Sequence, residues 1–206
     1  MTLIGVDESG TGAWAGPFVV CACAFVSPAP LGLKDSKKLS DKRRFDLTAQ
    51  LLSGPAVLGI RVVEPADIKK HGQQEAWELA VLAAIREVQE QLTSSTTLGT
   101  TRVVVDGNGS RRLADMLRFN SIEARFEPGA DDKYPEVSAA SIVAKTERNM
   151  RMRELAARHP EYGWDRNSGY GTPEHITAIQ THGKTPHHRD YATAYPARKK
   201  TKTWTR

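Results

Sequence analysis

Short apolar runs alternate with amphipathic segments along the chain. Runs rich in Val, Ile, Phe or small apolar residues predict strands over residues 2–7, 17–26, 56–64, 102–108 and 121–126. Apolar residues at a helical period predict a helix capped by Ser40, and others over 73–92, around 111–118, and over 135–159 and 173–183. Pro160 should end the long helix, and a Gly- and aromatic-rich loop should follow over 161–172. Because the first two strands are close enough for a hairpin, we predict an α/β fold, a mixed sheet flanked by helices, with an all-helical C-terminal part.

Composition narrows the class of protein. A chain of 206 residues that is 39% hydrophobic and 26% charged is typical of a soluble globular protein with one large domain. The sequence contains no stretch apolar enough for a membrane span, and we expect no secretion signal. Cys21 and Cys23 alternate along a predicted strand, so they share one face and should be buried reduced thiols. A cytoplasmic location follows from that interpretation.

Positive charge is concentrated at the C-terminus. The formal net charge is +5, and residues 198–206 hold five basic side chains and no acid, which leaves residues 1–197 balanced. This basic tail with its single Trp204 either steers the chain towards phosphate backbones or is a solvated, disordered terminus.

Acidic residues follow two of the predicted strands directly. Asp7 and Glu8 end the first strand, Asp106 ends the fourth, and Asp131 and Asp132 precede the long helix. Neighbouring strand ends meet at one sheet edge, and the repulsion within a carboxylate cluster is relieved by divalent cations such as Mg²⁺. Two ions could then cleave a phosphodiester. Each acid alone also fits a turn or a helix cap, so the residue pattern indicates a candidate phosphoryl-transfer site and no more.

Five blocks in order extend this interpretation: "GVDESGTGAWAGP", "GLKDSKKLS", "VVVDGN", "KYPEVSAASIVAK" and "SGYGTPEHITAIQTHGKTPHHR". Together they resemble ribonuclease HII, the type 2 ribonuclease H family, over residues 3–191. The resemblance implies a ribonuclease H-like fold and two Mg²⁺ or Mn²⁺ ions. It implies cleavage of RNA–DNA hybrids, and of duplex DNA with embedded ribonucleotides, on the 5′ side of the ribonucleotide, leaving a 3′-hydroxyl and a 5′-phosphate.

The resemblance also implies roles for particular residues. The catalytic and metal-binding carboxylates would be Asp7, Glu8, Asp106 and Asp131, the last chosen over Asp132 because the family places one variable residue between the acid and Lys. Asp7 would bridge both ions, Asp131 would help hold the ion that activates water, and Glu8 and Asp106 would hold the ion near the leaving 3′-oxygen. Substrate contacts are implied for Gly10, Thr11, Gly12, Lys37, Lys38, Ser141, Lys145 and Tyr170. From the residues alone, the lysines could equally be solvated, Ser141 a small packing residue and Tyr170 a packing anchor.

One position departs from the family pattern. The usual glycine–arginine–glycine is Gly10-Thr11-Gly12 here, so the flanking glycines remain but the guanidinium is absent. A small or neutral residue there is more like the related ribonuclease HIII group, which handles an isolated ribonucleotide poorly. Substrate preference is therefore left open between the two, and a non-catalytic nucleic-acid-binding module or a nuclease for structured DNA is a competing hypothesis.

The remaining predictions concern organisation and partners. We expect a catalytic core over 1–135, and C-terminal helices with a substrate-binding loop over 136–191 packed on it as one continuous unit, followed by the tail over 192–206. The histidines show no zinc-site spacing, and Ser9 and Ser36 lack a base for nucleophilic catalysis. The expected partners are RNA–DNA hybrids and ribonucleotide-containing duplexes. We expect no membrane association, see no clamp-binding peptide and expect a monomer.

Overall fold

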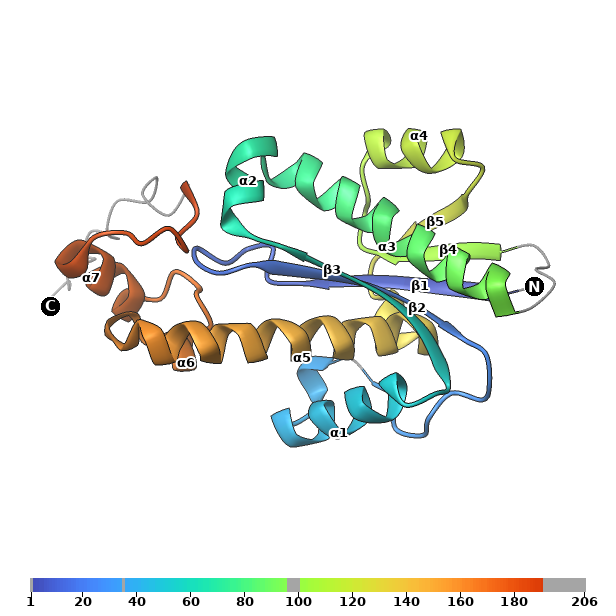
Figure 1. The fold of residues 1–206 in the computed structure, drawn as a ribbon, viewed down its shortest axis with the longest axis horizontal. Helices are drawn as coiled ribbons and strands as arrows, with labels where there is room; N and C mark the ends of the chain where they lie inside the picture. Colours follow the sequence, from blue (N-terminus) through green and yellow to red (C-terminus); the bar gives the residue numbers. More distant parts are fainter. Residues whose placement is uncertain (1, 35, 96–100, 191–206) are drawn as a thin grey trace, which may run out of the picture.

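The computed structural model describes residues 2–34, 36–95 and 101–190 (Figure 1). Its strands are β1 (Thr2–Ser9), β2 (Phe18–Phe25), β3 (Ala56–Val63), β4 (Thr101–Asp106) and β5 (Glu123–Glu127). Its helices are α1 (Asp41–Leu52), α2 (Pro65–His71), α3 (Gln73–Ser95), α4 (Arg111–Phe119), α5 (Pro135–Arg158), α6 (Trp164–Asn167) and α7 (Pro173–His182). The basic tail over 192–206 lies outside the described residues, so the prediction for it stands untested.

The five strands form one mixed sheet in the order β3-β2-β1-β4-β5. β1 pairs with β2 and β2 with β3 in antiparallel fashion, while β4 lies parallel to both β1 and β5. The predicted hairpin and mixed sheet are therefore confirmed. Because β1 and β4 are parallel neighbours, their carboxyl ends lie at the same edge of the sheet.

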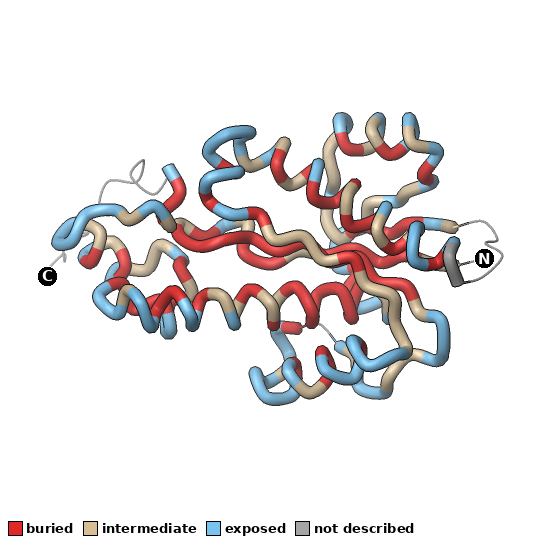
Figure 2. Tube along the Cα trace, viewed as in Figure 1, coloured by how far each residue is buried: buried red, intermediate tan, exposed pale blue. Residues whose placement is uncertain are grey.

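Helices cover both faces of this sheet (Figure 1). On one face, the α3 residues Val81, Ile85 and Val88 pack on alternate residues of the central strands, among them Val6 and Val20. On the other face, Ala139, Ala140 and Val143 of α5 pack against Val19, Cys21 and Cys23 of β2. The central strands β1 and β2 are largely buried between the two helical layers, as is the part of α5 over residues 137–144 (Figure 2).

Close packing of α5 on β1 depends on one glycine. A Cβ built on Gly5 would lie 2.3 Å from the main-chain nitrogen of Val137, so any side chain there would push the first turn of α5 off the sheet. The first turns of α5 consequently lie directly over the strand that carries Asp7 and Glu8.

The C-terminal elements form a separate apolar cluster at the far end of α5. Met152 and Leu155 of α5 pack there with Tyr162, Trp164 of α6 and Ala178 of α7. The predicted helical C-terminal part is confirmed, but two details were wrong. Residues 161–172 are not one loop, since they include a 3-10 turn over Pro160–Tyr162 and α6, and α2 was not predicted at all.

Local predictions largely agree with the structure. Ser40 caps α1, its hydroxyl accepting a hydrogen bond from the Arg43 main-chain nitrogen at 3.2 Å. Cys21 and Cys23 are buried free thiols on the face covered by α5, as expected. Among the described helices, none combines the length and apolar character needed to cross a membrane. The division between a core and a C-terminal part stays a prediction, and its boundary falls at the start of α5.

Candidate active site

Two acids lie side by side where the pairing of β1 with β4 ends. The parallel register pairs Val6 with Val105, and Asp7 and Asp106 follow one residue later on each strand. Since side chains alternate along a strand, both point to the face covered by α5, while Glu8 points to the face covered by α3. The strand ends thus supply carboxylates on both sides of one sheet edge.

Asp7 is buried, and its environment disfavours the charged form. Burial and the carboxylate of Glu8 raise the pKa of Asp7 to about 8, and Asp106 adds to this. The Glu8 main-chain N–H donates to Asp7 Oδ1 at 2.7 Å, and this bond and one with the Ser141 side chain partly oppose the rise in pKa. The protein therefore holds a carboxylate in a place where only added positive charge would make its ionised form favourable.

Glu8 is held by a residue that the sequence did not indicate. The Trp77 indole N–H of α3 donates to Glu8 Oε2 at 3.3 Å. Burial raises the pKa of Glu8, the Trp77 hydrogen bond lowers it, Asp106 raises it and the charge of Lys37 lowers it. Glu8, Asp106 and Lys37 are consequently close enough to influence one another.

Asp131 reaches this edge through a tight turn. Gly129 adopts a left-handed conformation (φ +72°) and starts the 3-10 turn Ala130–Asp132. The Ala130 main-chain N–H donates to Asp106 Oδ1 at 2.8 Å, which joins the turn to the end of β4. The Ser138 hydroxyl of α5 donates to the Asp131 carbonyl oxygen. Asp131 is buried and directly follows the residue whose N–H contacts Asp106.

The neighbouring acid has a different environment. Asp132 is exposed, and the Lys38 ammonium lies 2.6 Å from its carboxylate. The turn thus separates two consecutive acids into one facing the interior and one in a surface ion pair. Lys38, which the resemblance implies as a phosphate ligand, contacts Asp132 in this structure.

The other implied phosphate ligands lie along α5 and beside it. The hydroxyl oxygens of Ser141 and Ser36 lie 2.9 Å apart, within hydrogen-bond distance, and both side chains are buried. Lys145 is one turn further along α5, and its pKa is lowered by burial, then by the nearby cations Arg148, Arg44 and Lys37. Lys37 and Lys145 therefore belong to one positively charged region on the α5 side of the acids.

Two buried arginines lie against the Gly10-Thr11-Gly12 loop: Arg189 donates to its main chain, and Arg148 packs against Gly10. Arg189 donates to the carbonyl oxygens of Gly10 and Thr11 at 2.8 Å each, and to that of Gly16 at 3.0 Å. Gly10 has φ +91°, and a Cβ there would lie 1.8 Å from Nε of Arg148. The hydrogen bonds that its carbonyl groups accept from Arg189 thus fix the main chain of this loop.

Tyr170 lies beside this loop. Its side chain is 37% exposed, and the Arg148 guanidinium lies 5.4 Å from the ring centroid. A Cβ on Gly12 would be 4.0 Å from Tyr170 Cε1. The structure therefore brings together the two segments that the resemblance implies as substrate-reading elements.

Sequence reasoning missed several residues that hold these groups. The sequence analysis assigned no role to Trp77, Arg148 or Arg189. Both arginines are almost fully buried. The one hint to these residues in the sequence is that Arg189 ends the "TPHHR" portion of the last block. Spacing alone carries no sign of these contacts, because all of them join distant segments.

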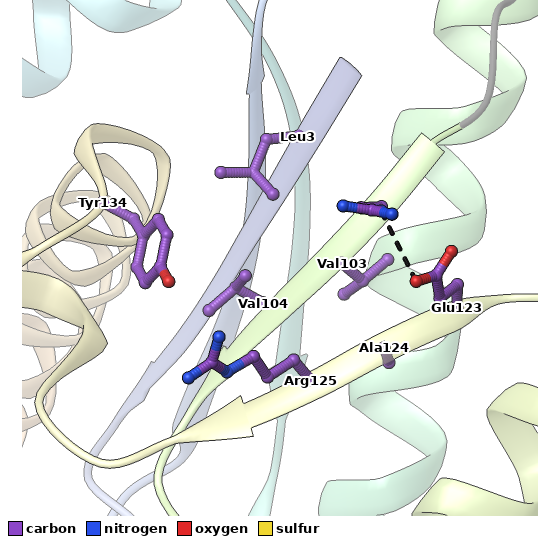
Figure 3. A pocket seen from close by; sticks show the side chains of 8 residues that line it. Leu3, Val103, Val104, Glu123, Ala124, Arg125 and Tyr134 are labelled. Atoms are coloured by element: carbon purple, nitrogen blue, oxygen red, sulfur yellow. Dashed lines mark ion pairs between the residues drawn. The ribbon is translucent and has the colours of Figure 1, made fainter. Parts of the chain in front are cut away.

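Two pockets differ in their relation to the acids. One of about 460 Å³ lies on the sheet face near the start of β1 and β4, lined by Leu3, Val104, Arg125 and Tyr134 among others, and contains none of the candidate residues (Figure 3). A smaller one of about 240 Å³ is lined by Glu8, Thr11, Trp77, Gly109 and the amides of Gln73 and Gln74. The second pocket adjoins the candidate active site.

The donor set suits a hard divalent cation. Within the described ranges, no three His, Cys, Asp or Glu side chains are grouped closely enough to hold a metal ion by themselves. Mg²⁺, however, keeps several waters and is commonly bound by one or two carboxylates together with substrate phosphate. Burial, and then the neighbouring Glu8 carboxylate, raise the pKa of the Asp7 carboxyl, and a bound cation would favour its ionised form. The residues therefore fit such an ion.

The fold and the site define an α/β protein of the ribonuclease H type, with carboxylates at the carboxyl edge of the central strands. Residues 4–195 match the family model of ribonuclease HII. The chain belongs to the ribonuclease HII family. Membership gives it ribonuclease H activity on RNA–DNA hybrids, as an endoribonuclease.

Individual relatives support the same assignment. Ribonuclease HII of Novosphingobium aromaticivorans is 44% identical over 92% of this chain and 94% of its own length. The Neisseria meningitidis serogroup A protein of the same name is 36% identical, with 91% of each chain covered. A solved complex of ribonuclease HII with PCNA from Archaeoglobus fulgidus has a TM-score of 0.76 and 26% identity, and covers 94% of this chain and 95% of that one. A Bst ribonuclease HIII structure with Mn²⁺ has a TM-score of 0.68 at 20% identity, covering 89% and 63%, and shows the shared fold.

Proposed function

We propose that the chain is a divalent-metal-dependent endonuclease that cuts on the 5′ side of a ribonucleotide, both in RNA–DNA hybrids and at ribonucleotides embedded in duplex DNA. Hydrolysis adds water across the P–O3′ bond, so the upstream strand keeps a 3′-hydroxyl and the ribonucleotide keeps a 5′-phosphate. The observation that carries the proposal is the buried Asp7 next to Glu8 and Asp106, with its pKa raised to about 8.

Four carboxylates would hold two ions, Mg²⁺ or Mn²⁺. Asp7 would contact both, Asp131 would complete one position, and Glu8 and Asp106 would complete the other. When bound, the ions supply positive charge that polarises the scissile phosphate and stabilises charge on the attacking and leaving oxygens. The contacts of Glu8 with Trp77 and of Asp106 with Ala130 support this division, because each holds a carboxylate in a fixed orientation before metal arrives.

The remaining residues would bind and orient the nucleic acid. Lys37 and Lys145 supply positive charge for the phosphate, and the Ser141 hydroxyl can contact it, since all three are on the α5 side of the acids. Lys38 would have to exchange its ion pair with Asp132 for a phosphate contact. Tyr170 would stack on a sugar beside the RNA–DNA junction, as its exposed ring suggests.

The Gly10-Thr11-Gly12 loop would read the 2′-hydroxyl through its main chain. Arg189 holds the carbonyl groups of this loop from inside the protein, so main-chain recognition does not depend on the side chain at position 11. Thr11 brings no cation to the scissile phosphate. We therefore infer cleavage of long hybrids, and cleavage of isolated ribonucleotides with a reduced or altered preference.

The experiment compares two substrates under identical metal and salt conditions: a long RNA–DNA hybrid and a DNA duplex with one embedded ribonucleotide. Cleavage of both, with the hybrid cut at least as well, is the expected result. Rapid cleavage of the isolated site alone contradicts the altered preference, and binding of both substrates without any cleavage favours a non-catalytic nucleic-acid-binding module.

A further inference from the structure

Three segments meet around Tyr170 and are joined by main-chain hydrogen bonds. The Trp14 N–H donates to the Gly169 carbonyl at 2.7 Å, the Gly16 N–H to the His187 carbonyl at 2.9 Å, and the Arg189 N–H to the Trp14 carbonyl at 2.8 Å. The loop after β1, the loop before α7 and the segment after α7 are thus in register with one another. The position of Tyr170 relative to Gly10-Thr11-Gly12 is set by this junction.

His175, in the first turn of α7, makes a directed contact with the main chain of Tyr170. Its side chain is fully buried, and Nδ1 lies 2.9 Å from the Tyr170 carbonyl oxygen. The indole N–H of Trp164 points at the other ring nitrogen, Nε2, at 3.0 Å. An indole nitrogen can only donate, so Nε2 of His175 accepts and Nδ1 carries the proton. His175 therefore donates to the Tyr170 carbonyl.

His188 completes this arrangement from behind. The Thr185 main-chain N–H donates to its Nδ1 at 2.9 Å, which leaves the proton on Nε2. That nitrogen lies 3.2 Å from Nε2 of His175, so the N–H groups of Trp164 and His188 share the single lone pair of this acceptor. Every bond in the chain from Thr185 to Tyr170 thus has one assigned direction, and both imidazoles are neutral. Burial lowers the pKa of both rings, that of His188 to about 4, in agreement with this assignment.

We propose that His175, oriented by Trp164 and His188, is a positioning residue that fixes the main chain at Tyr170 and so presents the tyrosine ring to the nucleic acid. The inference rests on the proposed function, since it requires Tyr170 to contact substrate. The Tyr170 N–H is held as well, by the Asn167 carbonyl at 2.9 Å, and the Tyr170 carbonyl also accepts from the Thr172 main-chain N–H at 2.8 Å. His175 therefore adds a side-chain donor to a main chain that is already hydrogen-bonded on both sides.

A purely structural role for His175 makes a different prediction. If the histidine only packs the cluster of Tyr162, Trp164 and Ala178, its replacement lowers stability and affects every substrate contact alike. If His175 instead positions Tyr170, its replacement should weaken only the contact between Tyr170 and the substrate. The effect of replacing His175 should then vanish once the Tyr170 ring has been removed.

The test measures binding of a fluorescently labelled duplex with one ribonucleotide, by anisotropy in EDTA, together with KM and kcat in Mg²⁺. We expect His175→Leu to weaken binding and raise KM about tenfold, as Tyr170→Ala does, because stacking on one aromatic ring contributes roughly that factor or more. The double variant should bind about as weakly as Tyr170→Ala alone. Equal losses from His175→Leu with and without the Tyr170 ring overturn the proposal.

Two further variants separate positioning from folding. His175→Asn keeps an N–H near the place of Nδ1 and should recover most of the affinity that His175→Leu loses. His182→Leu makes the same change at an exposed position of α7 and should bind like the unmodified protein. If His175→Leu does not fold, the test uses His175→Asn and His188→Gln instead, and measures the melting temperature and the Kd of each. A His175→Asn protein that folds but binds tenfold more weakly overturns the proposal.

The outcomes distinguish this inference from the proposed function. A protein that leaves ribonucleotide-containing duplexes uncut contradicts the function itself. If the Kd of Tyr170→Ala is unchanged, Tyr170 does not contact the nucleic acid, and the proposed role of His175 is refuted as well. A weakened Tyr170→Ala with an unaffected His175→Leu refutes the role of His175 alone.

Discussion

Replacing Asp7 by Asn should make the metal-free protein more stable while it abolishes activity. The pKa of this carboxyl is raised from 3.8 to about 8 by burial and by Glu8. Because the folded pKa lies above the unfolded one, the folded state binds the extra proton, and stability is fully present below pH 3.8 and is lost as the pH rises towards 8. About three pKa units separate the ordinary value from pH 7, which corresponds to about 4 kcal/mol.

Asn is neutral at every pH and keeps an oxygen for the Glu8 N–H, so the variant avoids this cost. We expect up to about 4 kcal/mol of added stability at pH 7 in EDTA, or roughly 8 °C or more in Tm for a chain of this length. The difference should shrink as the pH is lowered towards 4. Excess Mg²⁺ should raise the Tm of the unmodified protein but not that of the variant.

Thermal unfolding followed by circular dichroism at several pH values, with and without Mg²⁺, measures both effects. Asp132→Asn is the matched control, because that acid is exposed and paired with Lys38, and its loss should change stability by no more than about 1 kcal/mol. A metal-free Asp7→Asn protein that melts at or below the temperature of the unmodified chain at pH 7 refutes the reasoning, as does a difference that does not depend on pH.

Three further predictions concern the groups around the acids. Trp77→Phe removes the hydrogen bond to Glu8 and should raise the Mn²⁺ concentration needed for half-maximal activity about 10- to 100-fold. If activity depends on the Mn²⁺ concentration as in the unmodified protein, this contact does not position Glu8 for metal binding. Arg189→Met removes the side-chain donor to the carbonyls of Gly10, Thr11 and Gly16, although Gly10 keeps its bond from the Ala13 N–H. It should lower the free energy of unfolding in urea by about 3 kcal/mol, whereas a loss below about 1 kcal/mol would show that the loop does not depend on Arg189. Burial lowers the pKa of His188 from 6.5 to about 4, so its contribution to stability should be present above pH 6.5 and be lost as the pH falls towards 4. Between these pH values the Tm of the unmodified protein should therefore fall more steeply than the Tm of His188→Gln.

The fold could be predicted to the extent that residue periodicity encodes it. The strands and the long helices have strong apolar patterns, and their ends moved by only a few residues; β4, for example, ends at Asp106 rather than at residue 108. Helices α2 and α6 were missed for a physical reason. Seven and four residues are too few to establish a helical period. Neither helix has a side-chain hydrogen bond at its N-cap, and each is held by a few buried residues, Ile68 of α2 and Trp164 of α6 among them.

The site was predictable only in part. Strand ends place Asp7, Glu8 and Asp106 at one edge from topology alone, because parallel neighbours share a carboxyl end. Residue periodicity does not distinguish Asp131 from Asp132, and only the family spacing favoured Asp131; in the structure the turn that begins at Gly129 buries Asp131 and leaves Asp132 exposed. Contacts such as those of Trp77 with Glu8 and of Arg189 with Thr11 join residues 69 and 178 positions apart, so they arise only when the chain folds.

Product mapping on a DNA duplex with a single embedded ribonucleotide, run with Mg²⁺ and with Mn²⁺, tests the central claim most directly. Four carboxylates holding two ions at the ends of β1 and β4 should yield one cut, directly 5′ of the ribonucleotide, with a 3′-hydroxyl on the upstream DNA and a 5′-phosphate on the ribonucleotide. A cut on the 3′ side of the ribonucleotide, or the same product in EDTA, would contradict it.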